Sequence, residues 1–230
     1  MNTNNKYLKN YLEVLFNKPL NEIKKADLDL VRSVSLEGDY DENNNYRIDL
    51  RDISMLPNID TLFISNAFLV IDDIKILIEN NIKKLSLLNC TIDNEDNFCL
   101  IKELETLELI NCFNDSFDFL KNMERLNKLS IINPINKAPI NINDINNTIK
   151  ELVLERCNII NFQSIENKNS IISLDILWSD LDTDILPFIN KIDSLKELCT
   201  NDNIDLINLK SDIIVKRDHI ADIFDEELRL

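Results

Sequence analysis

The side chains that could carry covalent chemistry in this chain are its cysteines and one histidine. There are five cysteines, Cys199 among them, and the histidine is His219. A Cys–His pair acts as a nucleophile when the two side chains are in hydrogen-bond contact and a third group orients them. Sequence alone does not bring Cys199 and His219 together. Thiol-dependent catalysis by Cys199 is therefore one hypothesis, and a free thiol without a catalytic role is the alternative.

The sequence offers few of the residues that a metal site or a phosphate-binding loop needs. One histidine excludes a cluster of histidine ligands. The acidic run 180–184 lacks the glycine and the distal glutamate of a calcium loop, and we expect it to cap a helix that begins near Thr183. The only glycine is Gly38, so no glycine-rich phosphate loop can be written. We expect no metal and no cofactor.

The net charge of the chain limits the classes of partner that it is expected to bind. The formal net charge is −16 and the sequence pI is near 4.5. Acidic surfaces repel phosphate backbones and anionic lipid headgroups, so we expect neither a nucleic acid nor a membrane as partner. A protein partner is expected, and a basic protein is compatible with this charge. A monomer is the favoured state.

The elements that would position any site repeat along the chain. Each unit reads apolar, two variable residues, apolar, one variable residue, apolar, as in 82–87 and 149–154. The apolar-x-apolar centre predicts a short strand with one buried face. The units recur every 22 to 24 residues after a first spacing of 28, with central residues Val34, Leu62, Leu85, Leu107, Leu129, Leu152, Leu174 and Leu198. A constant period of this length indicates a solenoid.

The ninth position of each unit holds a small or polar residue: Asp39, Ala67, Cys90, Cys112, Pro134, Cys157, Ser179 and Asn203. With this pattern the chain resembles the leucine-rich repeat family over residues 28–205, and the wording of 53–62 is similar to the 22-residue bacterial, internalin-like type. The resemblance implies an α/β horseshoe with a parallel sheet on its concave face and short helices or turns on its convex face. It also implies non-enzymatic binding of another protein.

We expect one structural domain with three parts. Residues 1–27 form a helical N-terminal cap, residues 28–205 form about eight repeats, and residues 206–230 form a C-terminal cap with an edge strand at 213–215 and a helix at 219–228. Convex helices are predicted at 71–79, 94–103, 117–125 and 183–192. Between Pro134 and Pro139 we expect an extended convex segment.

The cysteines and the N-terminal residues indicate in which cellular compartment the protein is expected. Cysteines at equivalent repeat positions indicate packing rather than disulfides, and hence a reducing compartment. No N-terminal signal is visible, and no apolar run reaches the roughly 18 residues of a membrane span. The expected localisation is the cytoplasm.

Strand alternation gives a candidate binding surface on the concave face. The third, fifth, seventh and eighth positions of each unit face outward there. They place large apolar and charged residues on an exposed face, which is typical of interaction sites; the candidate partner-binding residues are Phe63, Leu88, Ile110, Ile132, Glu155, Arg156, Leu177 and Trp178. A charged rim is expected from Glu108, Glu151, Glu155, Arg156 and Asp175. The column Asn66, Asn89, Asn111 and Asn133 is interpreted as a structural ladder.

Two alternatives remain for the apolar residues of this surface. They could pack on one another, or a register shift of one residue would make them core, since such a slip exchanges the two faces. The function favoured by the sequence is binding of a partner protein through the concave face. Self-association through the apolar patch or a terminal edge, and a thiol enzyme using Cys199, are the other hypotheses.

Overall fold

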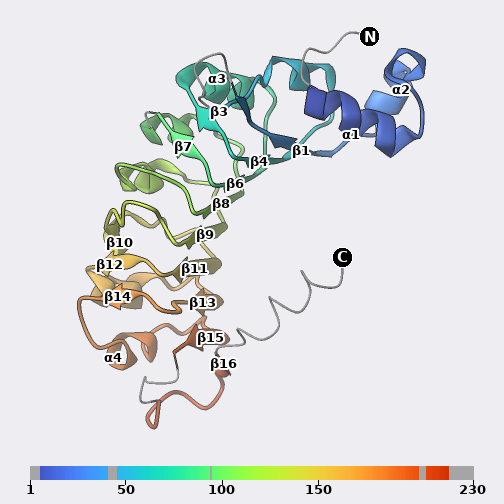
Figure 1. The fold of residues 1–230 in the computed structure, drawn as a ribbon. Helices are drawn as coiled ribbons and strands as arrows, with labels where there is room; N and C mark the ends of the chain where they lie inside the picture. Colours follow the sequence, from blue (N-terminus) through green and yellow to red (C-terminus); the bar gives the residue numbers. More distant parts are fainter. Residues whose placement is uncertain (1–5, 41–45, 94, 202–205, 218–230) are drawn as a thin grey trace.

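The computed structural model describes residues 6–40, 46–93, 95–201 and 206–217 of the 230-residue chain. Its main element is a nine-stranded parallel sheet in which each repeat contributes one strand. The strands follow chain order and line the inner side of a curved solenoid (Figure 1). They are β1 (Ser33–Glu37), β4 (Thr61–Ser65), β6 (Lys84–Leu88), β8 (Thr106–Ile110), β9 (Lys128–Ile132), β11 (Glu151–Glu155), β13 (Ser173–Asp175), β15 (Glu197–Thr200) and β16 (Ile214–Arg217). The predicted horseshoe with a concave parallel sheet is confirmed.

The register of the sheet is the one that the repeat predicts. Val34 pairs with Leu62, and the central leucines then pair strand by strand to Leu198. In β4, Leu62 and Ile64 are buried while Phe63 between them is 44% exposed. Because inward and outward residues alternate as predicted, the alternative of a one-residue slip is wrong.

The convex side is built from short helical turns and short strands, which Figure 1 shows opposite the long sheet. The first predicted convex helix is α3 (Ile71–Glu79), with the predicted bounds. The next two are single 3-10 turns rather than α-helices, and the fourth is a one-turn helix: η3 (Glu95–Leu100), η4 (Asp118–Asn122) and α4 (Leu186–Ile189). Three further 3-10 turns are η2 (Arg51–Met55), η5 (Ile142–Asp144) and η6 (Phe162–Asn167). The 3-10 helix is tighter than the α-helix and occurs in short pieces such as these.

Two small sheets run along the convex side, beside the helical turns. One has the order β2-β3-β5-β7 and the other β10-β12-β14. Their members are β2 (Asp39–Tyr40), β3 (Tyr46–Arg47), β5 (Phe68–Leu69), β7 (Thr91–Ile92), β10 (Ile140–Asn141), β12 (Asn158–Ile160) and β14 (Asp180–Leu181). The segment between Pro134 and Pro139 has no helix; a turn there has Lys137 N donating to Pro134 O at 3.2 Å.

A single apolar core fills the space between the long sheet and the convex turns. Leucine and isoleucine at the fourth and sixth positions form its wall on the side of the long sheet. Among the other core residues, the Phe119 ring packs against Phe98 and Phe117 with centroids 5.6 and 6.4 Å apart. Cys90, Cys112 and Cys157 are buried and free. Each thiol hydrogen-bonds backbone carbonyl groups, for example Cys112 Sγ to Leu87 O at 3.4 Å. These cysteines therefore occupy packing positions.

The N-terminal end of the sheet is covered by α1 (Lys6–Phe16). Leu8 and Leu12 on one face of α1 are buried, and the Tyr11 hydroxyl donates to Ser33 O of β1 at 2.7 Å. The chain continues through η1 (Leu20–Glu22) and α2 (Lys25–Leu28). At the other end β16 is the last strand, where the sequence predicts one. The predicted helix 219–228, which includes His219, lies outside the described residues.

Candidate functional site

The central feature of the concave face is a line of three aliphatic side chains on neighbouring strands, which we call the apolar row: Leu88, Ile110 and Ile132. Leu88 is paired with Ile110, and Ile110 with Ile132. Leu88 is 39% exposed and the two isoleucines are half-buried. The row continues into Glu155 of β11, which is the Cα partner of Ile132. Side chains on strands about 4.8 Å apart form a continuous strip, so a partner would meet one apolar surface.

A hollow lies on the same face beside the exposed ring of Phe63, toward the residues with which the strands begin. Its walls come from β4, β6, β8 and β9. The side chains that line this Phe63 hollow are those of Thr61, Phe63, Lys84, Ser86, Thr106, Glu108 and Lys128, above Leu62 and Leu85. The hollow therefore combines one aromatic wall with hydroxyl and charged groups.

Leu177 corrects one expectation from the sequence. It was expected on the exposed face, but it is only 7% exposed, so that prediction is wrong. The reason is that β13 ends at Asp175, whose carboxylate Oδ1 accepts a hydrogen bond from Leu177 N at 3.1 Å. This turn stops the strand alternation: Ile176 belongs to the apolar core, and Leu177 next to it is buried as well.

Asparagine occupies the eighth position of four consecutive repeats, after β4, β6, β8 and β9. These residues have φ between 50° and 53°, in the left-handed region that asparagine tolerates better than most residues: Asn66, Asn89, Asn111 and Asn133. The Nδ2 atoms of the last three each donate to Oδ1 of the preceding asparagine, at 3.1, 3.2 and 2.8 Å. Asn66 Nδ2 donates to the Glu37 carboxylate at 2.9 Å. The predicted structural ladder, which we call the asparagine ladder, is confirmed.

Two large side chains replace asparagine where the ladder stops. Arg156 and Trp178 follow β11 and β13 with φ of 54° and 51°. The Arg156 Cζ atom lies 5.1 Å from the centroid of the Trp178 ring, and the Trp178 amide donates to Asn201 Oδ1 at 2.9 Å. Arg156 is exposed and Trp178 is 36% exposed. A left-handed conformation costs such residues about 1 kcal/mol each, so this Arg156–Trp178 pair is held at some expense in stability.

The predicted charged rim is present, and two of its acidic residues share an ion-pair partner within the molecule. Lys128 Nζ lies 3.2 Å from Glu108 Oε1 and 3.9 Å from Glu151 Oε2. At the C-terminal end Lys216 Nζ lies 2.7 Å from Glu197 Oε2. Reading the third-position column for charge would have found Lys84 and Lys128, which were not among the predicted site residues.

Cys199 is not activated by its surroundings. Burial, and then the negative charge of Asp175, raise the pKa of the Cys199 thiol to about 12. Burial also raises the pKa of the Asp175 carboxyl above its usual range. A nucleophilic cysteine needs a lowered pKa, which positive neighbours or a helix N-terminus provide. His219, the hypothetical base, lies outside the described residues.

The described residues give no support to a metal centre or a membrane-spanning helix. Among them, no group of three or more histidine, cysteine or acidic side chains is placed to hold a metal ion. Within the same part of the chain, no helix has the length and the apolar character needed to cross a bilayer.

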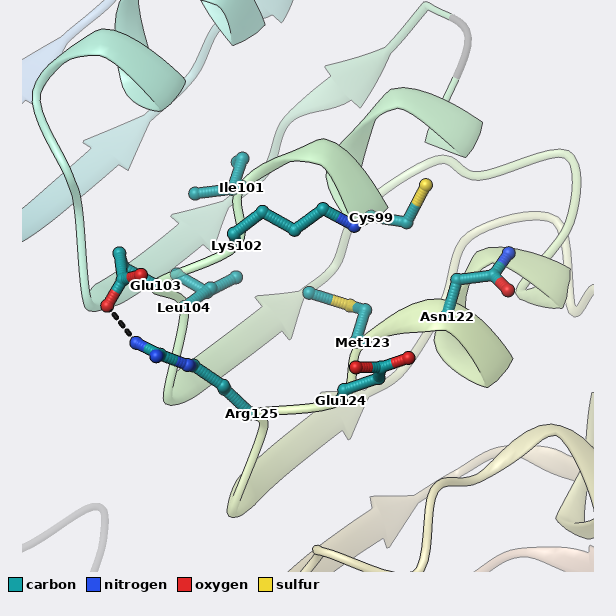
Figure 2. Close-up of a pocket in the computed structure, with 9 residues that line it drawn as sticks. All are labelled: Cys99, Ile101, Lys102, Glu103, Leu104, Asn122, Met123, Glu124 and Arg125. Carbon is teal, nitrogen blue, oxygen red and sulfur yellow. Dashed lines mark hydrogen bonds and ion pairs between the residues drawn. The ribbon is translucent and has the colours of Figure 1, made fainter.

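A second hollow lies at the edge where the chain enters β8 and β9 (Figure 2). An ion pair between Glu103 and Arg125 joins the two repeats at its rim, and Figure 2 shows the two side chains meeting there. Cys99 reaches into it, with its thiol donating to Asp96 O at 3.0 Å. Neither a histidine nor an aromatic ring lines this hollow, so we interpret it as a crevice between successive repeats.

Comparison with known proteins bears on the fold. No protein-family model matches the sequence, and the comparison with curated proteins gives no match. Among solved structures, internalin C2 of Listeria monocytogenes has a TM-score of 0.54 and 16% identity, over 93% of this chain and 93% of that one. Internalin F of the same organism has a TM-score of 0.61 and 17% identity, over 92% of this chain and 68% of that one.

A third similar structure is that of TLR13 in complex with ssRNA13. Its TM-score is 0.55 at 18% identity, over 86% of this chain and 32% of that one. At these identities the similarity establishes the fold and nothing finer. This chain has the leucine-rich repeat fold that is seen in the internalins.

Proposed function

We propose that this protein acts by binding a partner protein through its concave face, without catalysing a reaction. The observation that carries the proposal is the apolar row of Leu88, Ile110 and Ile132, flanked by the exposed rings of Phe63 and Trp178. A contiguous apolar patch on a solvent-exposed face commonly marks an interaction site. Tryptophan and arginine, which form the Arg156–Trp178 pair, are among the residues most enriched at binding hot spots.

The scaffold favours this mode of action. The concave side chains stand on a nine-stranded sheet whose strands are paired in register along its length. A preformed surface loses little conformational entropy on binding, so more of the contact energy goes into affinity. The raised pKa of Cys199 opposes the alternative of a thiol enzyme.

A protein is favoured over RNA as the partner. The solved TLR13 structure holds ssRNA13, so an RNA ligand is the alternative that the structural comparison raises. A chain of net charge −16 repels a phosphate backbone, which needs several lysines or arginines for its neutralisation. The net charge favours a partner that is not itself strongly acidic.

The cysteines support a proposal for the compartment. All five are free, and Cys90, Cys112 and Cys157 are buried as thiols bonded to backbone carbonyl groups. Cysteines that all remain free thiols are typical of a reducing compartment, such as the cytoplasm. We propose the cytoplasm on this ground.

The test is affinity capture with two folded variants beside the wild type. The concave variant carries Leu88→Asp, Ile110→Asp and Trp178→Asp. The control variant carries Leu30→Asp and Ile135→Asp, two exposed apolar residues outside the concave face. We expect the wild type and the control to retain the same protein from a cell lysate, before and after treatment with ribonuclease, and the concave variant to lose it.

Three outcomes would contradict the proposal. Retention of the same protein by the concave variant would place the binding surface elsewhere. Loss of the partner after ribonuclease treatment would favour RNA. A stable homodimer that buries Trp178, detected by light scattering at several concentrations, would favour self-association instead.

A further inference from the structure

One lysine of the concave face differs from its charged neighbours. Lys128 is paired with Glu108 and Glu151, and Lys216 is paired with Glu197. The exposed ammonium of Lys84 has neither an ion pair nor a hydrogen bond among the residues that the structure describes. A charge that finds no partner inside its own molecule is available to a partner from outside.

Lys84 projects into the Phe63 hollow, where other hydrogen-bond donors surround it. On the sheet it lies between Thr61 and Thr106, its Cα partners on either side. The hydroxyls of Ser86 and Thr106 line the same hollow, and the ring of Phe63 forms its apolar wall. An ammonium offers three donors and each hydroxyl offers one. This set matches the two acceptor oxygens of a carboxylate carried on an apolar residue.

A single carboxylate fits this hollow better than a polyanion. Glu108 lies in the same hollow, and although Lys128 pairs with it, its charge would repel further phosphates. Nucleic-acid affinity grows with the number of cations that contact phosphates, and Lys84 is one free cation in a chain of net charge −16. One carboxylate requires only one cation and can bond to it directly.

The apolar row indicates which side chains the partner must carry beside that carboxylate. Leu88 lies on the same strand as Lys84, four residues further on, which is about 13 Å along the sheet. From Leu88 the row crosses to Ile110 and Ile132 and then meets Glu155. At this far end Glu155 would repel a carboxylate, and the Arg156 guanidinium already lies over the Trp178 ring. The acidic group of a partner is therefore best accommodated at the Lys84 end.

We propose that the concave face binds a protein segment that presents a carboxylate to Lys84 in the Phe63 hollow and apolar side chains to Leu88, Ile110 and Ile132. This inference rests on the proposed function, because it names the chemistry of the partner for the same surface. It also gives the bound segment one orientation, with its acidic residue toward β4 and β6 and its apolar residues toward the ends of β6, β8 and β9.

A random peptide library displayed on phage is the probe for this proposal. We expect selection on the wild-type protein to enrich peptides with an aspartate or glutamate spaced from two or more Leu, Ile or Phe residues. Lys84→Glu should weaken the selected peptides about tenfold or more, since the variant puts like charges together. Lys84→Arg should retain them. The control is Lys83→Glu, which makes the same charge change at a neighbouring lysine that is paired with Glu105 and does not line the hollow.

The outcomes separate this inference from the proposed function. Peptides that are lost with Leu88→Asp/Ile110→Asp but bind Lys84→Glu as well as wild type would overturn the carboxylate assignment and leave concave binding intact. Peptides that bind both variants unchanged would overturn both. Selected sequences rich in lysine and arginine, or a library that gives no binder, would also refute the inference. So would a single-stranded oligouridylate whose binding depends on Lys84, because the hollow would then take phosphate.

Discussion

The ends of the concave strands form two regions with the same backbone and different side chains. After β4, β6, β8 and β9 the left-handed position holds the asparagine ladder, in which each amide bonds to the next. After β11 and β13 the same position, with the same φ, holds the Arg156–Trp178 pair. Asparagine suits this backbone, whereas arginine and tryptophan are strained in it.

The contrast between the two regions indicates which residues are candidates for a binding function. A residue that fits its backbone and satisfies its neighbours has a sufficient structural explanation. Where a local rule is broken and a large, exposed side chain results, the position is a candidate for selection by a partner. The ladder therefore has a structural explanation, and we include the Arg156–Trp178 pair in the proposed binding surface.

The largest effect on the fold is expected from a break in the middle of the ladder. Asn111→Ala removes the donor to Asn89 and the acceptor for Asn133 and leaves alanine in the left-handed region. We expect the free energy of unfolding to fall by about 2 to 3 kcal/mol, measured by urea denaturation. Asn111→Gly is the control, since it loses the same hydrogen bonds without the backbone strain and should lose less. An unchanged midpoint for Asn111→Ala would mean that the ladder does not stabilise the fold.

A smaller effect of opposite sign is expected from extending the ladder through the other region. The double change Arg156→Asn/Trp178→Asn relieves two strained positions and supplies two further amides, at the cost of one cation–π contact of about 0.5 to 1 kcal/mol and of the buried part of the Trp178 ring. We expect the free energy of unfolding to rise by less than about 1 kcal/mol.

The same double variant should also lose the partner that the wild type captures. A variant that is more stable and no longer binds would show that this region gives up stability for recognition. A less stable variant would show that the Arg156–Trp178 pair is itself a structural element. Undiminished capture by a stable variant would remove both residues from the proposed binding surface.

Much of this comparison could be anticipated from the sequence, and the rest has identifiable physical causes. The strand centres, the bounds of α3 and the asparagine ladder follow from a period that fixes which residues are stacked on which. Leu177 could not be placed, because its burial depends on a turn that the Asp175 carboxylate makes with one backbone amide. The convex segments after β6 and β8 are 3-10 turns and not the predicted α-helices, because apolar residues three and four apart in a short segment fit both geometries.

The repeat pattern also did not predict which charged side chains form ion pairs with one another. The charged rim follows from strand alternation, but its neutralisation depends on Lys128 reaching across strands to Glu108 and Glu151. Long side chains choose partners by geometry that a one-dimensional pattern does not carry. For the same reason Lys84 becomes notable only when its neighbours are seen to be paired with one another.

The smallest effect concerns the fifth-position row that runs beside both regions. In the first region this row holds Ser86, Glu108 and Ser130, and Glu108 is paired with Lys128, whereas beside Trp178 the row holds the partly buried Asp175. Burial raises the pKa of Asp175 above its usual value, so the folded state holds the proton more tightly than the unfolded state. Stability is therefore lost as the pH rises through the interval between the usual and the raised pKa, and the ionised carboxylate is a cost at neutral pH.

Asp175→Asn keeps an oxygen for the Leu177 amide and removes the buried charge. We expect a gain of about 0.5 kcal/mol at neutral pH, because partial exposure screens the charge, and we expect the gain to shrink as the pH is lowered toward about 4. Urea denaturation of the variant and the wild type across this range measures it. Ser130→Asn, a neutral change in the same row, is the control and should show no such pH dependence. A gain from Asp175→Asn that is equal at all pH values would mean that shape rather than charge distinguishes the two regions along this row.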